Sequence, residues 1–294
     1  MKTISIWPIL LGIMITLSSL SCSKDKGAKE ILQEAQTAYD NGQFAQAVSL
    51  AKQVDTLAIT NIELRKEALK IRREARIKYN ENRLDTINAT LDSCQKIIDL
   101  YEPQMLAFKA NEMVEGIRMY YREFIPQANI TKNAISISTD TIGRVTITST
   151  YVGSPINHTS IKINETNSNE EINLPQVKYD KGLNYRYKSG GKQYEIVTYP
   201  DSISEVFNFI KKAKDRKNGL KCEYIRNGQK TGISIRLSPN LTDKMSNTIE
   251  IAQCYANRFR LKRERTKIEK ENKYLDKALK GEIKDGINDS KKTI

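Results

Sequence analysis

Two hydrophobic patterns alternate along the chain. Apolar residues recur at helical spacing up to residue 124 and again from residue 243, whereas residues 130–240 largely alternate with a period of two. A spacing of three and four predicts helices, and a period of two predicts strands. We therefore expect an α+β fold: an N-terminal helical hairpin and long helix, an inserted antiparallel, sandwich-like β domain, and a long C-terminal helix that packs back as an antiparallel stalk.

The helical region is expected to span residues 30–124. It contains a hairpin at 30–54 and a helix at 62–101 that has no Pro or Gly and carries a coiled-coil-like apolar seam. The stretch MLAFKANEMVEGIRMYYREF (105–124) keeps helical apolar spacing, so a further helix is predicted there.

The hairpin resembles one tetratricopeptide repeat. Gly42 breaks the helix, the aromatic Phe44 follows two residues later, and the small Ala47 follows five residues later. No second copy occurs at the 34-residue spacing of that family, and a solenoid needs at least three stacked units. The resemblance therefore implies one TPR-like hairpin and not an array.

The β domain is expected at residues 130–240. Candidate strands lie at 134–138, 144–152, 159–163, 183–188, 192–199, 221–225 and 232–237, with a short amphipathic helix at 202–214. Ser189-Gly190-Gly191 predicts a hairpin turn between two of these strands. About seven short strands with regular turns favour a sandwich-like domain.

The C-terminal helix is expected at 243–286, followed by a tail at 287–294. Its apolar positions repeat every seven residues from Cys254, but Arg258, Arg265 and Asn272 interrupt the seam. It therefore needs a partner in the same chain, and we expect it to pair with helix 62–101 rather than lie as an independent surface helix. Cys94 and Cys254 then face each other, either as a disulfide or as packed free thiols.

The first 21 residues have the pattern of a signal peptide. Lys2 is followed by an uncharged stretch whose apolar core, residues 4–17, is shorter than the ~20 residues of a membrane span. A transmembrane anchor is the alternative interpretation.

The residues around Cys22 resemble a bacterial lipobox. Ser21 is the small residue before the cysteine, Ser19 replaces the usual Leu, and the charged stretch 23–26 resembles the start of Bacteroidetes lipoproteins. The resemblance implies cleavage before Cys22, a fatty acid such as palmitate on Cys22, and a tether at 22–29. It implies a lipoprotein of the outer membrane, facing the periplasm or the cell surface. The helix–β–helix order is similar to that of uncharacterised lipoproteins in this group, which brings no activity with it.

The chain is strongly basic, with 48 Lys and Arg against 35 Asp and Glu. In an exported protein this excess favours a protein or acidic polysaccharide partner over nucleic acid. The alternative is a lysine-rich surface that serves solubility.

Nothing in the sequence indicates a catalytic centre. The usual phosphate-binding, nucleophile-elbow and zinc motifs are absent, and the one histidine, His158, excludes a histidine-clustered metal site. We therefore expect a non-enzymatic protein without metal or cofactor.

One stretch of the β domain is a candidate binding face. His158 follows a Gly-Ser-Pro turn, and Tyr185, Tyr187 and Tyr194 alternate along two strands beside basic residues. These four side chains could line a sugar- or peptide-binding face. Alternatively, His158 is a local capping group and the tyrosines are ordinary half-buried strand residues.

The sequence thus supports three hypotheses. The first is an envelope lipoprotein that presents a β recognition domain on a helical stalk. The second is a carbohydrate- or peptide-binding module of an uptake or adhesion system, and the third is a hydrolase whose site the sequence does not reveal. A concave groove lined by Tyr185, Tyr187 or Lys192 would favour the second over the first.

Overall fold

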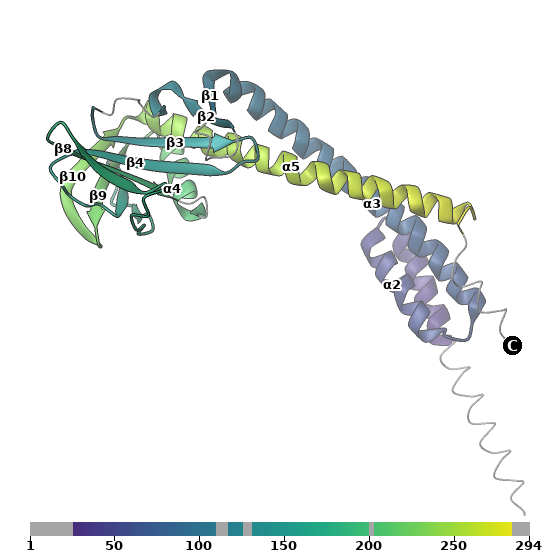
Figure 1. The fold of residues 1–294 in the computed structure, drawn as a ribbon. Helices are drawn as coiled ribbons and strands as arrows, with labels where there is room; N and C mark the ends of the chain where they lie inside the picture. Colours follow the sequence, from purple (N-terminus) through teal and green to yellow (C-terminus); the bar gives the residue numbers. More distant parts are fainter. Residues whose placement is uncertain (1–25, 110–116, 126–130, 200–202, 284–294) are drawn as a thin grey trace, which may run out of the picture. The chain divides into compact units, whose positions relative to one another are not determined.

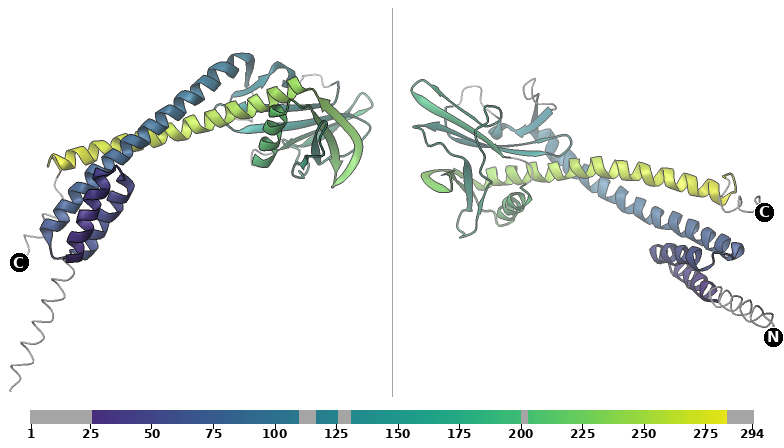
Figure 2. Two further views of the ribbon diagram at one scale, coloured as in Figure 1. Left: turned by 180° about the vertical axis from the view of Figure 1, so that it is seen from behind. Right: turned by 60° about the horizontal axis from the view of Figure 1, so that its bottom comes forward.

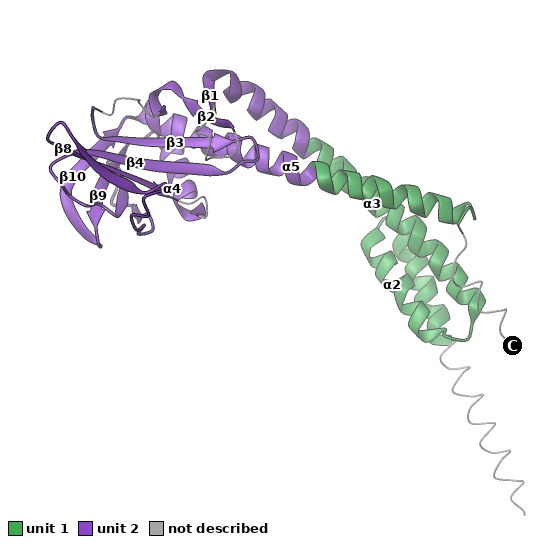
Figure 3. Ribbon diagram, viewed as in Figure 1, with its two compact units in different colours: residues 1–89, 262–294 green, residues 90–261 purple. Residues whose placement is uncertain are grey.

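The computed structural model describes residues 26–109, 117–125, 131–199 and 203–283 (Figures 1 and 2). The chain divides into a helical unit, residues 1–89 with 262–294, and a β unit, residues 90–261 (Figure 3). The long helices α3 (Ile62–Tyr101) and α5 (Pro239–Leu279) each contribute to both units. The α+β class predicted from the sequence is confirmed. None of the described helices is both long and apolar enough to span a bilayer.

The helical unit begins with the predicted hairpin. A helix at residues 26–40 is followed by a turn with Gly42 at φ +73° and by α2 (Phe44–Leu57). The two helices approach closely because the residues between them are small: Ala35, Ala47 and Ala51 are buried. Residues 26–29, which were expected to belong to the tether, are helical, and residues 22–25 lie outside the described part of the chain.

Within the helical unit, α3 and α5 run antiparallel across a polar seam. Arg76 and Arg83 of α3 pair with Glu271 and Glu264 of α5, and the acidic partners follow in reverse chain order. The buried Asn80 donates from Nδ2 to Oδ1 of Asn272 over 2.7 Å. The predicted antiparallel pairing is therefore confirmed, and Asn80 and Asn272 place a polar contact within the seam.

The β unit contains two antiparallel sheets. One has six strands in the order β1-β2-β3-β4-β8-β7, and the other has four in the order β10-β9-β5-β6. The strands are β1 (Met105–Lys109), β2 (Ile117–Tyr121), β3 (Ala134–Asp140), β4 (Val145–Gly153), β5 (Ser160–Glu165), β6 (Glu171–Asn173), β7 (Tyr185–Ser189), β8 (Lys192–Tyr199), β9 (Leu220–Arg226) and β10 (Gln229–Leu237). The helix α4 (Ser204–Asp215) connects β8 to β9.

The core of the β unit gathers the inward residues of both sheets. Ile137 and Ile147 of the first sheet join Ile161 and Ile163 of the second in one buried cluster. Residues of α4 and of the first part of α5 complete this cluster, among them Ile210 and Ile249. One face of each strand is thereby buried, so the opposite face of β3, β4 and β8 is left for other contacts.

Two expected element assignments are corrected, and one strand was missed. The helix predicted at 105–124 is instead the hairpin strands β1 and β2, so the β region starts near residue 105 and not 130. The three-residue strand β6 was not predicted. The last helix runs over Pro239–Leu279 rather than 243–286. The expected signal peptide, Cys22 and the expected tail at 287–294 lie outside the described residues.

Candidate binding face on the six-stranded sheet

A cavity of about 810 Å³ lies on the outer face of the six-stranded sheet. Its floor is formed by Ser136 of β3, Thr148 and Thr150 of β4, and Ile196 and Thr198 of β8. Its walls include Phe124, Leu183, Tyr185 and Leu241. It thus combines a row of hydroxyl groups with apolar and aromatic sides.

Strand register explains why these side chains share one face. Ser136 pairs with Thr148, which pairs with Thr198 across the next strand. Thr150 pairs with Ile196, which pairs with Tyr185. Directly paired residues project to the same side of an antiparallel sheet, so the floor is a regular lattice of cross-strand neighbours.

Hydrogen bonds hold much of the floor in place. The hydroxyls of Thr148 and Thr198 lie 3.3 Å apart, and Thr198 Oγ1 donates to the carbonyl of Leu183 at 3.3 Å. Ser136 Oγ donates to the carbonyl of Phe124, which ties the floor to the short η2 turn (Arg122–Phe124). The floor is therefore preformed, as binding pockets usually are.

Three tyrosines continue this face at the β7–β8 edge. The rings of Tyr187 and Tyr194 are stacked with centroids 4.8 Å apart, and Tyr185 stacks on Tyr187 at 6.2 Å. Tyr185 is 40% exposed and is the member of this row that lines the cavity. The sequence grouped these tyrosines correctly on one face.

Another aromatic pair, the exposed Phe108 and the half-buried Tyr120, lies on the same face of the sheet. Phe108 and Tyr120 meet edge to face with centroids 6.2 Å apart on the β1–β2 hairpin. Arg118, which lies on the same side of β2 as Tyr120, donates a hydrogen bond to Thr146 Oγ1 on β4. Thr146 alternates with Thr148 and Thr150, so the pair and the cavity belong to one face.

The expectation that His158 joins the tyrosines on this face is wrong. His158 is fully buried between the two sheets, and its ring meets that of Tyr224 edge to face at 4.9 Å. The cause is Glu195, whose side chain points inward from β8 and accepts a 2.9 Å hydrogen bond from His158 Nδ1. The sequence pattern gave no sign that an inward strand position carries a carboxylate that recruits the histidine.

The carboxylate of Glu195 is held by a dense set of donors. The backbone N–H groups of Ile156, Asn157 and His158 donate to it, and so does the hydroxyl of Tyr179. Burial raises the pKa of Glu195, but the hydrogen bonds from the His158 side chain and from the backbone N–H groups of Asn157 and His158 outweigh it. The pKa therefore lies below its ordinary value of 4.5.

Ser149, His158 and Glu195 have the hydrogen-bond order of a serine-hydrolase triad. His158 Nε2 lies 2.9 Å from Ser149 Oγ, which is also 3.0 Å from the hydroxyl of Tyr199. All three side chains of the triad-like set are fully buried, however, and a nucleophile must be reachable by its substrate. We therefore interpret the set as a polar network of the core.

The three cysteines of the β unit are buried free thiols. Burial raises the pKa of Cys254 to about 12, and a hydrogen bond with Cys94 adds to this effect. Of the two alternatives for Cys94 and Cys254, the structure has the packed thiols. Cys222 is buried in the core, where burial raises its pKa to about 12.

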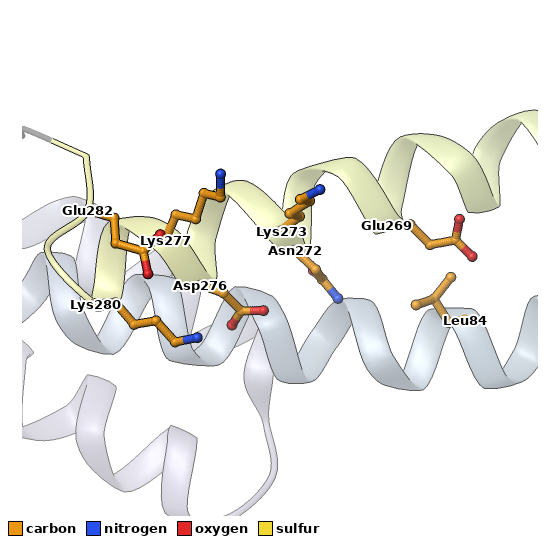
Figure 4. A pocket seen from close by; sticks show the side chains of 8 residues that line it. All are labelled: Leu84, Glu269, Asn272, Lys273, Asp276, Lys277, Lys280 and Glu282. Atoms are coloured by element: carbon orange, nitrogen blue, oxygen red, sulfur yellow. The ribbon is translucent and has the colours of Figure 1, made fainter.

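The helical unit offers less specific hollows. One of about 470 Å³ is lined by Leu84 and by charged and amide side chains of α5 and the turn after it (Figure 4). Another of about 520 Å³ lies on the N-terminal hairpin between Glu30 and Leu50. The described residues contain no cluster of His, Cys, Asp or Glu suited to a metal ion, in these hollows or elsewhere.

Sequence reasoning missed the floor of the cavity. Thr148, Thr150 and Thr198 read as ordinary outward positions of alternating strands, and only the order of the strands brings them together. These threonines and the tyrosines occupy the outward positions of β4, β8 and β7. That shared position would have grouped them on one face only if these strands were already known to be neighbours.

Comparisons with models of known protein families, with curated proteins and with solved structures gave no match to this chain.

Proposed function

We propose that the β unit is a carbohydrate-binding module whose site is the cavity on the outer face of the six-stranded sheet. The observation that carries this proposal is the concave, hydroxyl-lined floor that ends at Tyr185. The cavity volume of about 810 Å³ lies within the range of ligand-binding pockets.

The chemistry of the lining suits a sugar ring. A pyranose presents flat C–H faces and a rim of hydroxyl groups. The exposed ring of Tyr185 can stack on a C–H face of the sugar. The sugar hydroxyls can exchange hydrogen bonds with the hydroxyls of Ser136, Thr148, Thr150 and Thr198. The ring of Tyr187 stacks on that of Tyr185 and restricts its motion before a ligand arrives. Less conformational entropy of the Tyr185 side chain is therefore lost on binding.

A peptide is the less favoured occupant. Peptides that add to a sheet pair with the backbone of an edge strand. The floor strand β4 is already paired with β3 on one side and β8 on the other, so its backbone groups are occupied. A ligand on this face must be recognised by side chains, which favours a molecule rich in hydroxyl groups.

We also propose that this module belongs to a non-enzymatic envelope lipoprotein anchored through Cys22. The support is the sequence alone: the short apolar segment, Ser21 before the cysteine and the charged residues after it. Anchoring a sugar-binding unit to the outer membrane fits a role in the capture or adhesion of polysaccharide.

A glycan array probed with the full chain tests the sugar-binding proposal, followed by calorimetry on the best ligand. We expect Tyr185→Ala to weaken binding about tenfold, because it removes the stacking surface. Tyr274→Ala is the matched control, since Tyr274 is 54% exposed on α5 in the helical unit and is not among the residues that line the cavity. Binding to a peptide array but to no glycan, or equal loss in both variants, would overturn the proposal.

A further inference from the structure

Basic side chains outnumber acidic ones among the residues that line the cavity. Arg122 and Lys132 line it as cations, and Glu123 is the one carboxylate among its lining residues. Glu123 is already neutralised, because Lys244 Nζ lies 2.5 Å from its Oε1. Among the described residues, neither Arg122 nor Lys132 has a carboxylate within ion-pair distance.

The same sheet face adds a third cation near the η2 turn. Arg118 lies four residues before Arg122 and is hydrogen-bonded to Thr146. Asp140 lies opposite Arg118 in the β2–β3 pair, but its carboxylate is bound by Arg144 at 2.6 Å. Glu123 and Asp140 are therefore paired with Lys244 and Arg144, and among the described residues Arg122 and Lys132 are left for a ligand.

The protonation behaviour of Glu123 agrees with a positive local field. The hydrogen bond from Lys244 is the main cause that lowers its pKa, and the charge of Arg122 contributes. Glu123 thus stays ionised and bound to Lys244 rather than free to neutralise Arg122. A cavity with two uncompensated cations and a hydroxyl floor complements an anionic, hydroxyl-rich molecule.

We infer that the ligand of this cavity is an acidic sugar chain, whose carboxylate or sulfate groups bind Arg122 and Lys132 while a ring stacks on Tyr185. This inference rests on the proposed sugar-binding function and adds its substrate class. The Arg122 guanidinium can donate two parallel hydrogen bonds to a carboxylate, and Lys132 contributes a compact charge.

The test compares acidic oligosaccharides with a neutral one. Oligogalacturonate, its methyl-esterified form and a sulfated oligosaccharide of equal length are titrated into the full chain by calorimetry. We expect at least one acidic ligand to bind about tenfold or more tightly than the neutral ester. Whether the uronate or the sulfate binds better identifies the anionic group.

Paired variants locate the effect. Arg122→Gln with Lys132→Gln should reduce the affinity for the acidic ligand to that of the ester and leave ester binding unchanged. Lys178→Gln with Lys230→Gln, which removes the same charge from exposed lysines outside the cavity, should change the acidic affinity less than twofold.

The outcomes separate the two proposals. Equal binding of acidic and neutral ligands, or an acidic preference that survives in the cavity variant, would overturn the inference and leave sugar binding intact. If no ligand here or on the glycan array binds the wild type, the sugar-binding proposal itself is wrong, and the inference falls with it.

Discussion

Glu195 organises the interior of the β unit at the scale of single residues. Its carboxylate accepts hydrogen bonds from three successive backbone N–H groups, from His158 and from Tyr179, although it is fully buried. A buried charge is tolerated when donors surround it in this way. The chain entering β5 is thus fixed by one side chain from β8, which no local pattern could have predicted.

This arrangement predicts an acid-sensitive fold. The folded pKa of Glu195 lies below its ordinary value of 4.5, so its stabilising contribution is complete above that pH and is lost as the pH falls through the folded pKa. Urea unfolding at several pH values should show this loss. Glu195→Ala should reduce the free energy of unfolding at pH 7 by about 3–5 kcal/mol, because it leaves buried donors unpaired.

The Glu195→Gln variant separates the effect of protonating the Glu195 carboxylate from the effect of losing the side chain's packing. It should reduce the loss of stability as the pH falls below about 4.5, and Glu205→Gln, at an exposed carboxylate of α4, is the matched control. A Glu195→Gln variant with the wild-type pH profile would show that this group does not contribute.

The buried thiols lead to a second residue-scale prediction. With pKa values raised to about 12, Cys222 and Cys254 are protonated at pH 8, and thiols react as thiolates. We expect iodoacetamide to alkylate them only after urea unfolding, as measured by mass spectrometry of the cysteine-containing peptides. Rapid alkylation of the folded chain, or a cross-linked Cys94–Cys254 peptide, would contradict this account.

The long helices and most strands were predictable from periodicity at the scale of elements. The expected helix at 62–101 matches α3, and the expected strand at 192–199 matches β8. The β1–β2 hairpin was not predictable, because its apolar residues also satisfy helical spacing. The strand conformation of this hairpin depends on the pairing of β2 with β3 and on the burial of Met119 and Tyr121 in the core of the β unit. Neither contact is visible in the local sequence pattern.

The polar seam of the helical unit makes a testable contribution to helix pairing. Arg76 binds Glu271 through two hydrogen bonds of 2.9 and 3.2 Å. Reversing either charge alone, Arg76→Glu or Glu271→Arg, should lower the free energy of unfolding by about 1 kcal/mol, because both side chains are partly exposed. The double reversal should restore most of that loss in a double-mutant cycle.

The pair Lys78–Glu81 is the control for this cycle. It has a similar distance of 2.8 Å but lies within α3 alone and is more exposed. Its reversal should show a smaller coupling of about 0.3–0.5 kcal/mol. Equal coupling in the two cycles would contradict a role of the seam in pairing the helices.

At the scale of the whole molecule, the expected acidic partner rests on the basic composition, and the expected lipid anchor rests on the pattern of the N-terminal residues. The sequence led to the fold class and to the tyrosine row, because both follow from alternation and from turns. It did not lead to the cavity, because Thr148 and Thr198 are 50 residues apart and become neighbours only through strand order. The single His158 was equally unpredictable, since its place depends on Glu195.

Lipidation of Cys22 is the whole-molecule prediction. If the Cys22 thiol carries the lipid, as proposed, Cys22→Ala should abolish labelling with a palmitate analogue and release the protein from the membrane fraction. Ser23→Ala is a matched control one residue away and should leave both unchanged. Labelling that survives in Cys22→Ala would contradict the lipoprotein proposal.

The central claim is that a sugar binds on the outer face of the six-stranded sheet, and methyl NMR tests it most directly. Ile and Thr methyl groups are labelled, and the best glycan from the array is titrated into the full chain. The account predicts the largest shift changes at Thr148, Thr150 and Ile196 in the cavity, with Ile161 and Ile163 of the other sheet unchanged. Shifts confined to the four-stranded sheet or to the helical unit, with the cavity methyls unmoved, would contradict it.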